Sequence, residues 1–284
     1  SKYFFVKLVF LSKGTGLNNY LDKTIIKHYL FESRKDFFKN IKKFREFIKQ
    51  ISIDKKNILV FSICFSADLV NFLSFHKFPI VSSIRANLMA NYKFTYGFLG
   101  YFLALTHLLV LKNFSLVFSM TLSMKKQIFK LVGLHSYIII NFIDENNPDL
   151  SILNRKESNK KKKFNLLFLG SLTGRKNPEL LIEAINKIDK YEVSLDIIGD
   201  GELKERVSNL ISRMNLTSKV RLLGFLKNPI KLLNNYDILV APSLSEGTSR
   251  AVLESLSMGL RCVLRDIDGN SELSLISENV FLFK

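Results

Sequence analysis

Cysteine is scarce in this sequence of 284 residues, and the scarcity excludes several classes of protein. The two cysteines, Cys64 and Cys262, lie nearly 200 positions apart. They form neither a disulfide framework nor a spacing typical of zinc sites. Such a cysteine content fits a reducing compartment, so the sequence predicts a cytoplasmic protein.

Long apolar runs are missing as well. The N-terminal apolar stretch is interrupted at Lys7 and predicts a strand rather than a signal peptide. The longest uncharged stretch lies between Lys93 and Lys112 and only just reaches the length of a membrane span. Because it contains two glycines, two threonines and His107, it predicts a buried or interfacial helix instead.

Acidic residues are few compared with basic ones. The sequence has 42 lysines and arginines against 25 aspartates and glutamates, which gives a net charge of +17. Residues 1–150 hold 21 of the basic and 9 of the acidic residues, so most of the excess lies in the first half. A basic surface favours polyanions such as nucleic acid, anionic lipid or phosphorylated substrates. The alternative is a compositional bias towards lysine.

The composition is otherwise that of a globular protein, with 47% hydrophobic and 24% charged residues. At roughly 100–200 residues per domain, the length predicts two domains. Residues 151–163 are polar and end in four lysines, so they predict a linker. The predicted domains are therefore residues 1–150 and residues 164–284.

Strand-like and helix-like segments alternate in both halves, which predicts parallel sheets wrapped by helices. The second half has the six strands of one doubly wound domain, and the first half has five, one fewer. Two such Rossmann-like domains place their ligand in the cleft between them. The predicted strands are 4–11, 57–61, 80–83, 115–118, 137–141, 165–170, 193–198, 220–223, 238–241, 261–264 and 280–283. The predicted helices are 35–50, 66–76, 97–111, 122–132, 178–188, one from about 202, a short one before 236, and 248–258.

The segment most suggestive of chemistry is Ser245–Glu254, which follows a predicted strand that ends at Pro242. A glycine loop and then a helix follow, and free N–H groups at a helix start bind anions. Gly247 permits close approach of a ligand to the backbone. Glu246 and Glu254 are about 12 Å apart along a helix, which suits the two ends of an extended sugar–diphosphate–ribose ligand. The alternative is a capped surface helix with two unrelated glutamates.

This segment resembles the E-x7-E motif of the retaining glycosyltransferases of family 4, which have the GT-B fold. Four further segments resemble the nucleotide domain of that family in order: Phe168–Ala184, Ile198–Leu203, Val220–Phe225 and Val263–Leu273. Two more, Ser82–Asn87 and Asn141–Asp144, resemble its acceptor-side loop and its crossing between domains. The similarity is greatest to bacterial enzymes that build O-antigen and capsular polysaccharide.

The resemblance implies roles for individual residues. Glu246 would contact sugar hydroxyls, Glu254 the ribose, and Lys176 with Arg175 the diphosphate that leaves. The implied catalytic residues are Glu246, Lys176 and Arg175. The implied nucleotide-sugar-binding residues are Gly170, Ser171, Gly199, Gly201, Gly224, Phe225, Gly247, Thr248, Ser249 and Glu254. The implied acceptor-side residues are Arg85 and Asn87.

Two positions depart from the family pattern. Ser171 stands where the family has an arginine, and Arg175 is the predicted substitute. Arg85 stands near a position where many members have a histidine, and it is predicted to contact phosphate or acceptor, with a surface role as the alternative. His76 and His107 are further candidates in the first half, although a lone histidine in an apolar helix is more often structural.

No cofactor and no metal are predicted. Asp266 and Asp268 mimic the D-x-D motif of metal-dependent transferases, but that motif belongs to another fold. Here the two aspartates end a predicted strand and are expected to shape a turn with Gly269. The sequence offers no histidine or carboxylate cluster suited to a metal ion.

The resemblance also indicates that the ends of the family fold are missing. The strand 4–11 would be the family's second strand, and Gly14 and Gly16 would form a turn rather than a phosphate loop. No helix that crosses back to the first domain follows residue 284. The chain thus resembles a family member trimmed at both ends, either a fragment or a degenerate protein.

The predicted function is the transfer of a hexose or N-acetylhexosamine from a UDP-sugar to a lipid-linked saccharide, with retention, in the synthesis of O-antigen or capsule. One alternative is an inactive or truncated nucleotide-binding remnant. Another is a basic nucleic-acid-binding protein, but no helix-turn-helix, zinc finger or RNA-binding signature supports it, so nucleic acid is not an expected partner.

An anionic membrane surface is the last predicted partner, reached through the first domain at the inner face of the cell membrane. Between Asp36 and Lys49, apolar residues recur at helical spacing and basic residues fill the other faces. The apolar residues are Phe37, Phe38, Ile41, Phe44, Phe47 and Ile48. The same pattern equally predicts an ordinary helix packed on its own sheet.

Overall fold

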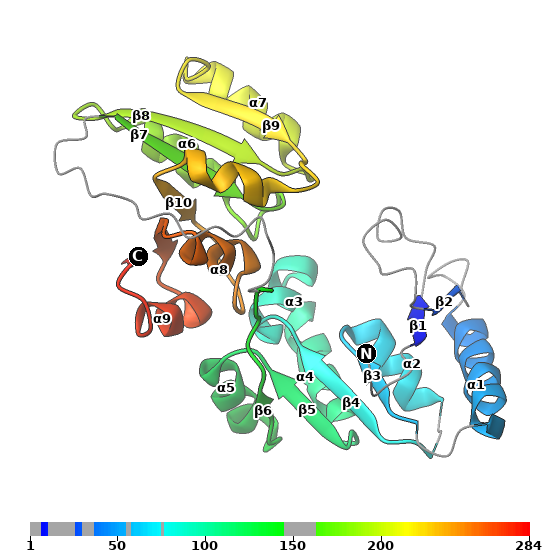
Figure 1. The fold of residues 1–284 in the computed structure, drawn as a ribbon. Coiled ribbons are helices and arrows are strands. Elements are labelled where there is room, and N and C mark those ends of the chain that lie inside the picture. The colour runs from blue at the N-terminus through cyan, green and yellow to red at the C-terminus, as the bar shows by residue number, and fades with distance from the viewer. Residues whose placement is uncertain (1–6, 11–25, 30–36, 55–57, 75–76, 145–162) are drawn as a thin grey trace.

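The computed structural model describes residues 7–10, 26–29, 37–54, 58–74, 77–144 and 163–284. Both halves are α/β units built on parallel sheets, which confirms the predicted class (Figure 1). Residues 151–162 of the predicted linker, His76, Gly14 and Gly16 lie outside the described residues.

The second half contains one six-stranded sheet with the strand order β12-β11-β10-β7-β8-β9. All neighbouring strands are parallel. The strands are β7 (Lys163–Leu169), β8 (Glu192–Ile198), β9 (Val220–Gly224), β10 (Ile238–Ala241), β11 (Arg261–Arg265) and β12 (Val280–Phe283). The helices are α6 (Pro178–Asn186), α7 (Lys204–Arg213), the 3-10 helix Pro229–Asn235, α8 (Arg250–Ser257) and α9 (Asp268–Ser274).

Alternation along the strands divides the second half's core into two layers. Leu166 and Phe168 of β7 face a buried cluster with α6 and α7, whereas Leu167 faces a cluster with α8 and α9. Both faces of this sheet are therefore covered. The sequence missed α9 and extended the linker one residue too far, because Lys163 begins β7 and pairs with Glu192.

The first half contains a four-stranded parallel sheet with the order β3-β4-β5-β6. Its strands are β3 (Val60–Ser62), β4 (Ile80–Ile84), β5 (Leu116–Ser119) and β6 (Tyr137–Ile138). Its helices are α1 (Phe37–Asp54), α2 (Phe65–Leu73), α3 (Leu88–Tyr96), α4 (Leu99–Leu111) and α5 (Leu122–Val132). None of the helices in the described part of the chain is long and apolar enough to cross a membrane.

Two elements of the first half differ from the prediction. The predicted strand 4–11 contains β1 (Lys7–Phe10), but β1 pairs with an unpredicted strand, β2 (Ile26–Tyr29), in a separate sheet. The uncharged stretch between Lys93 and Lys112 contains α4 and only the last turn of the unpredicted α3. The two helices are separated at Gly97, whose φ of 60° ends α3 in a conformation that favours glycine.

The basic helix α1 packs on its own half. Ile41, Phe44, Phe47 and Ile48 are buried in one cluster with Val70 of α2. For these four side chains the structure therefore confirms the alternative prediction, an ordinary helix packed on its own half. Phe38, another of the predicted apolar residues, is 82% exposed instead.

Glu272 of α9 joins the two halves at the start of α5. Its carboxylate accepts hydrogen bonds from the backbone N–H groups of Leu122 and Ser123 and from the Ser123 hydroxyl, each at 2.8 Å. A carboxylate at a helix N-terminus satisfies donors that have no partner within the helix. Figure 1 shows α5 beside α9, and Asn87 at the start of α3 also donates to Asp268 of α9, so α9 lies at the junction of the halves.

Candidate functional site

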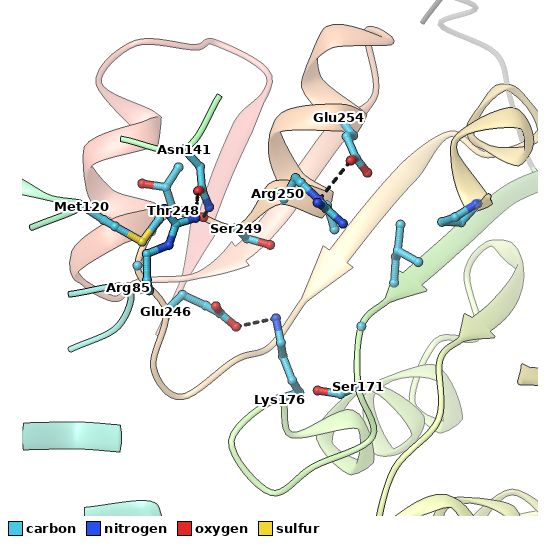
Figure 2. Close-up of a pocket in the computed structure, with 15 residues that line it drawn as sticks. Arg85, Met120, Asn141, Ser171, Lys176, Glu246, Thr248, Ser249, Arg250 and Glu254 are labelled. Atoms are coloured by element: carbon cyan, nitrogen blue, oxygen red, sulfur yellow. Dashed lines mark hydrogen bonds and ion pairs between the residues drawn. The ribbon is translucent and has the colours of Figure 1, made fainter. Parts of the chain in front are cut away.

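A cavity of about 400 Å³ lies between the halves (Figure 2). Its walls come from the ends of β4 and β5 and the segment after β6 in the first half, and from the loops after β7 and β10 in the second. The lining residues are Arg85, Met120, Asn141, Leu169, Gly170, Ser171, Lys176, Pro229, Glu246, Gly247, Thr248, Ser249, Arg250, Ala251 and Glu254. The position agrees with the predicted cleft at the carboxyl ends of the sheets.

Three glycines mark the ends of neighbouring strands on the second-half side. The N–H of Gly170 donates to the Ile198 carbonyl at 3.0 Å, and the N–H of Gly199 donates to the Gly224 carbonyl at 2.9 Å. A Cβ on Gly199 would lie 1.8 Å from the Gly170 carbonyl oxygen, so only glycine fits there. These two hydrogen bonds hold the loops after β7, β8 and β9 side by side. Gly170 also lines the cavity.

Glu246 lies between two cations. Its Oε1 is 2.5 Å from Lys176 Nζ and 2.9 Å from Arg175 Nη1, and its side chain is 11% exposed. Arg175 also donates to the Ser245 carbonyl at 2.6 Å. Lys176 faces the cavity, as Figure 2 shows, whereas Arg175 is not among the lining residues. Arg175 therefore fixes the loop that carries Glu246.

The helix after this loop begins at Arg250 rather than at the predicted Thr248. No side chain caps its N-terminus, although Ser249 stands at the capping position. The first N–H groups of such a helix suit an anion. Arg250 lines the cavity beside them and adds a positive charge.

Glu254 lies one turn further along α8, and its side chain is 13% exposed. Its Oε1 is 3.3 Å from Arg250 Nε. Burial raises the pKa of this carboxyl, and Arg250 opposes the rise. Glu254 and Glu246 thus stand at different places around one cavity, with Lys176 and Arg250 among its lining residues (Figure 2).

Arg85 and Asn141 form the first-half wall. Arg85 donates to the Asn141 side-chain carbonyl, and Asn141 donates to the Thr248 carbonyl at 2.6 Å. Asn87 instead caps α3 by accepting from the Ala90 N–H, and it donates to Asp268 of α9 at 3.1 Å. Arg85 therefore meets the cavity, whereas Asn87 joins the halves beside it.

The structure brings most of the predicted site residues together. Those that line the cavity are Arg85, Gly170, Ser171, Lys176, Glu246, Gly247, Thr248, Ser249 and Glu254. Those that do not are Asn87, Arg175, Gly199, Gly201, Gly224 and Phe225. Gly201 packs on the Leu172 backbone, and Phe225 is an exposed side chain after β9.

Several lining residues, Arg250 and Asn141 among them, have no site role predicted from the sequence. Arg250 lies inside the quoted motif, and its place at the start of a helix was an available signal. Asn141 lies in the quoted crossing segment, but its bond to Thr248 joins positions 107 residues apart. Met120 gave no signal, because an apolar residue at a strand end is ordinary core in sequence.

The two aspartates of the D-x-D mimic do not shape a simple turn. Asp268 starts α9, and Asp266 accepts from the Ser271 hydroxyl at 2.7 Å. No group of three or more possible metal ligands occurs in the described part of the chain. Independence from metal stays a prediction.

His107, a candidate from the sequence, is buried away from the cavity. Its Nε2 is 2.8 Å from Asp68 Oδ2, and its Nδ1 is 2.9 Å from the Tyr92 hydroxyl. Asp68 also accepts from the Ser62 hydroxyl. This histidine therefore ties α2, α3 and α4 together, which agrees with the structural alternative.

Comparison with known families finds a match for the second half. Residues 151–284 match the model of the glycosyl transferases group 1. An uncharacterised glycosyltransferase of Methanocaldococcus jannaschii is 39% identical over 108 residues, which are 37% of this chain and 27% of that protein.

Two bacterial relatives carry more specific names. The UDP-Gal:alpha-D-GlcNAc-diphosphoundecaprenol alpha-1,3-galactosyltransferase of Escherichia coli is 36% identical over 117 residues, 39% of this chain and 30% of the enzyme. The N-acetylgalactosamine-N,N'-diacetylbacillosaminyl-diphospho-undecaprenol 4-alpha-N-acetylgalactosaminyltransferase of Campylobacter jejuni is 36% identical over 125 residues, 42% of this chain and 34% of the enzyme. The matches thus span about a third of these relatives.

The fold is shared with solved GT-B structures. Anabaena HepE in complex with UDP-glucose superimposes with a TM-score of 0.76, over 98% of this chain and 77% of HepE, at 17% identity. At this identity the likeness establishes the arrangement of two Rossmann-like halves.

Proposed function

We propose that this chain, which carries a group 1 glycosyltransferase domain in residues 151–284, transfers a hexose or N-acetylhexosamine from a UDP-sugar to a lipid-linked saccharide. The place of the reaction is the synthesis of a surface polysaccharide of the O-antigen or capsule type. The products are the extended lipid-linked saccharide and UDP. We further propose a retaining transfer without a metal, as the resemblance to family 4 implies.

The observation that carries the proposal is the distribution of charge around the cavity. Lys176 and Arg250 provide cations, the start of α8 provides N–H groups, and Glu254 provides a half-buried carboxylate. A diphosphate suits the cations and N–H groups, and the vicinal hydroxyls of a ribose suit the carboxylate. A nucleoside diphosphate satisfies both requirements at once.

The complex of HepE with UDP-glucose supports the choice of nucleotide, because its fold is the same. The name of the E. coli relative supports the acceptor, since it states a diphosphoundecaprenol-linked sugar. Two further E. coli relatives are named as O-antigen biosynthesis glycosyltransferases. These names are the basis for the lipid-linked acceptor and for the polysaccharide.

The proposed reaction uses the charges around the cavity. The bond between the anomeric carbon and the diphosphate oxygen breaks, and negative charge grows on that oxygen beside Lys176. The acceptor hydroxyl forms the new bond on the same face, and its proton passes to the departing diphosphate. Glu246 is not a nucleophile in this scheme, because Lys176 and Arg175 hold its carboxylate. Glu246 orients the sugar hydroxyls instead.

The test is binding of UDP, measured by calorimetry, together with the rise in melting temperature that each nucleotide sugar produces. Glu254→Ala removes charge-assisted hydrogen bonds to the ribose, worth about 1.5–3 kcal/mol, so UDP affinity falls roughly 10- to 150-fold. Glu183→Ala is the matched control, because Glu183 is an exposed carboxylate of α6 outside the cavity.

Unchanged UDP affinity in Glu254→Ala contradicts the assignment of the ribose site. UDP binding without transfer to a diphosphoprenol-linked sugar favours the alternative of an inactive remnant. Ser171 stands where the family has an arginine. The loss of that positive charge is the specific reason to consider an inactive protein.

A further inference from the structure

The turn between α3 and α4 exposes a continuous group of apolar side chains. Every residue from Lys93 to Leu99 is exposed, including Phe98 at 81% and Leu99 at 67%. The Phe98 and Phe102 rings pack edge to face with centroids 5.7 Å apart. We call these side chains the aromatic turn: Phe94, Tyr96, Phe98, Leu99, Tyr101 and Phe102.

The surrounding structure holds the aromatic turn outwards. A Cβ on Gly100 would lie 2.1 Å from the Tyr92 carbonyl oxygen, so α3 and α4 are in backbone contact. Below this contact, Tyr92, His107 and Asp68 are joined by buried hydrogen bonds. The apolar side chains therefore project from a fixed helical hairpin instead of folding back onto the core.

The chain around the aromatic turn carries charge of one sign only. Residues 69–143 contain seven lysines and arginines and not a single aspartate or glutamate. Lys93 is itself exposed within the turn, and Lys112 is exposed at the far end of α4. A surface that combines apolar rings with an exposed lysine is complementary to an anionic bilayer.

The aromatic turn lies close to the cavity along the chain. Helix α3 begins after Asn87, which bonds to Asp268 across the junction, and Arg85 lines the cavity two residues earlier. A helix of nine residues is about 13 Å long, so α3 leads from the cavity edge to the turn. Figure 1 shows α3 between the second half and α4.

We propose that the aromatic turn inserts into the headgroup region of an anionic membrane and holds the cavity at its surface. The proposed function gives this surface its purpose, since a lipid-linked acceptor stays in the membrane. Phenylalanine and tyrosine suit this position because the ring is apolar and the tyrosine hydroxyl remains hydrated. We therefore place the membrane element at the α3–α4 turn and not on α1, whose Ile41, Phe44, Phe47 and Ile48 are buried.

The test is co-sedimentation of the full chain with vesicles of phosphatidylcholine, with and without about one third phosphatidylglycerol. The variant Phe98→Ser/Leu99→Ser removes the two most exposed side chains of the aromatic turn. The matched control is Leu275→Ser/Ile276→Ser, because this adjacent pair in the second half is 84% and 75% exposed. Both variants remove exposed side chains, so both should keep the melting temperature.

We expect binding to the anionic vesicles at low salt, and at least about tenfold weaker binding for Phe98→Ser/Leu99→Ser but not for the control. High salt weakens the binding of the unchanged chain, because the lysines contribute. Absence of binding at low salt, or an equal loss of binding in both variants, overturns the proposal. So does a turn variant that still binds vesicles and differs from the unchanged chain only in forming no dimer.

UDP binding measured on the same preparations separates this proposal from the proposed function. A turn variant that loses vesicle binding and keeps UDP affinity supports the membrane surface. Vesicle binding through the turn in a chain that binds no UDP leaves this proposal standing while the proposed function fails.

Discussion

The second half of the molecule buries both faces of its sheet, whereas the first half leaves many large apolar side chains exposed. The second half also mixes acidic with basic residues, while residues 69–143 of the first half contain only basic ones. A half that holds a small charged ligand needs precise loops on a closed core. A half that meets a larger partner needs an accessible surface. These different roles of the two halves can be tested.

The largest effect is expected from Lys176→Ala. In the proposed reaction the Lys176 ammonium stabilises the charge that develops on the leaving diphosphate, so we expect kcat to fall by about a few hundredfold and UDP affinity to fall much less. Release of UDP from a UDP-sugar in the presence of acceptor measures kcat. Lys187→Ala is the control, because Lys187 is an exposed lysine at the end of α6. A loss confined to binding would make Lys176 an anchor only.

The next effect compares two buried carboxylates, one in each half. Asp68 accepts hydrogen bonds from the buried His107 and Ser62, so Asp68→Ala leaves His107 Nε2 without its partner and Ser62 with only a long contact of 3.5 Å to the Val81 carbonyl. We expect a cost of about 2 kcal/mol. Asp196 holds Tyr236 and the largely exposed Arg221, which water can solvate, so Asp196→Ala costs less.

Hydrogen exchange measured separately for each half checks this order. Asp68→Ala should reduce protection in α2, α3 and α4 without changing UDP affinity, and Asp68→Asn should recover part of the loss. If Asp196→Ala proves the more damaging of the two, the idea that the first half depends on this single network is wrong.

A smaller effect is expected where the halves meet. Glu272→Ala removes three hydrogen bonds to the start of α5, so we expect the two halves to be held together less tightly. We expect about tenfold slower transfer with unchanged UDP affinity, because the residues proposed to bind the donor all lie in the second half. Small-angle scattering should report a larger radius of gyration. Glu278→Ala, an exposed carboxylate nearby in sequence, should show neither change.

How much the sequence predicts also differs between the halves. In the second half the predicted strands match the structure to within two residues, because apolar runs bounded by glycine leave little choice. Helix α9 was missed because Asp268, Gly269 and Asn270 favour turns, and its burial against Gly247 is a tertiary effect.

In the first half, local pattern and tertiary structure diverge more. The pairing of β1 with β2 depends on contacts that no local signal encodes. The sequence identified α1 as the amphipathic basic helix, but its apolar face serves the core. For the site, the motif residues were predictable, whereas the bond of Asn141 to Thr248 appears only when the halves meet.

The smallest expected effect is the pH dependence of UDP binding through Glu254. Burial raises the pKa of this carboxyl, so it takes up a proton at a higher pH than an exposed glutamate does. In the proposed complex the ribose hydroxyls donate to the Glu254 carboxylate, and UDP affinity should therefore fall a few-fold as the pH drops from neutral towards that raised pKa. Glu254→Gln should bind UDP more weakly at neutral pH and lack this part of the dependence. Subtracting its profile removes the titration of the UDP phosphate itself.

The raised pKa of Glu254 has the opposite effect on folding stability, which falls as the pH increases and the carboxyl ionises. A raised pKa means that the folded chain binds more protons than the unfolded chain over the window between the two pKa values, so ionised Glu254 lowers stability above that window. Glu254→Gln should accordingly melt at a higher temperature than the unchanged chain at neutral pH. The difference should vanish as the pH falls below the ordinary range of a glutamic acid. A variant that melts lower at neutral pH would show that Arg250, rather than burial, dominates the environment of this carboxylate.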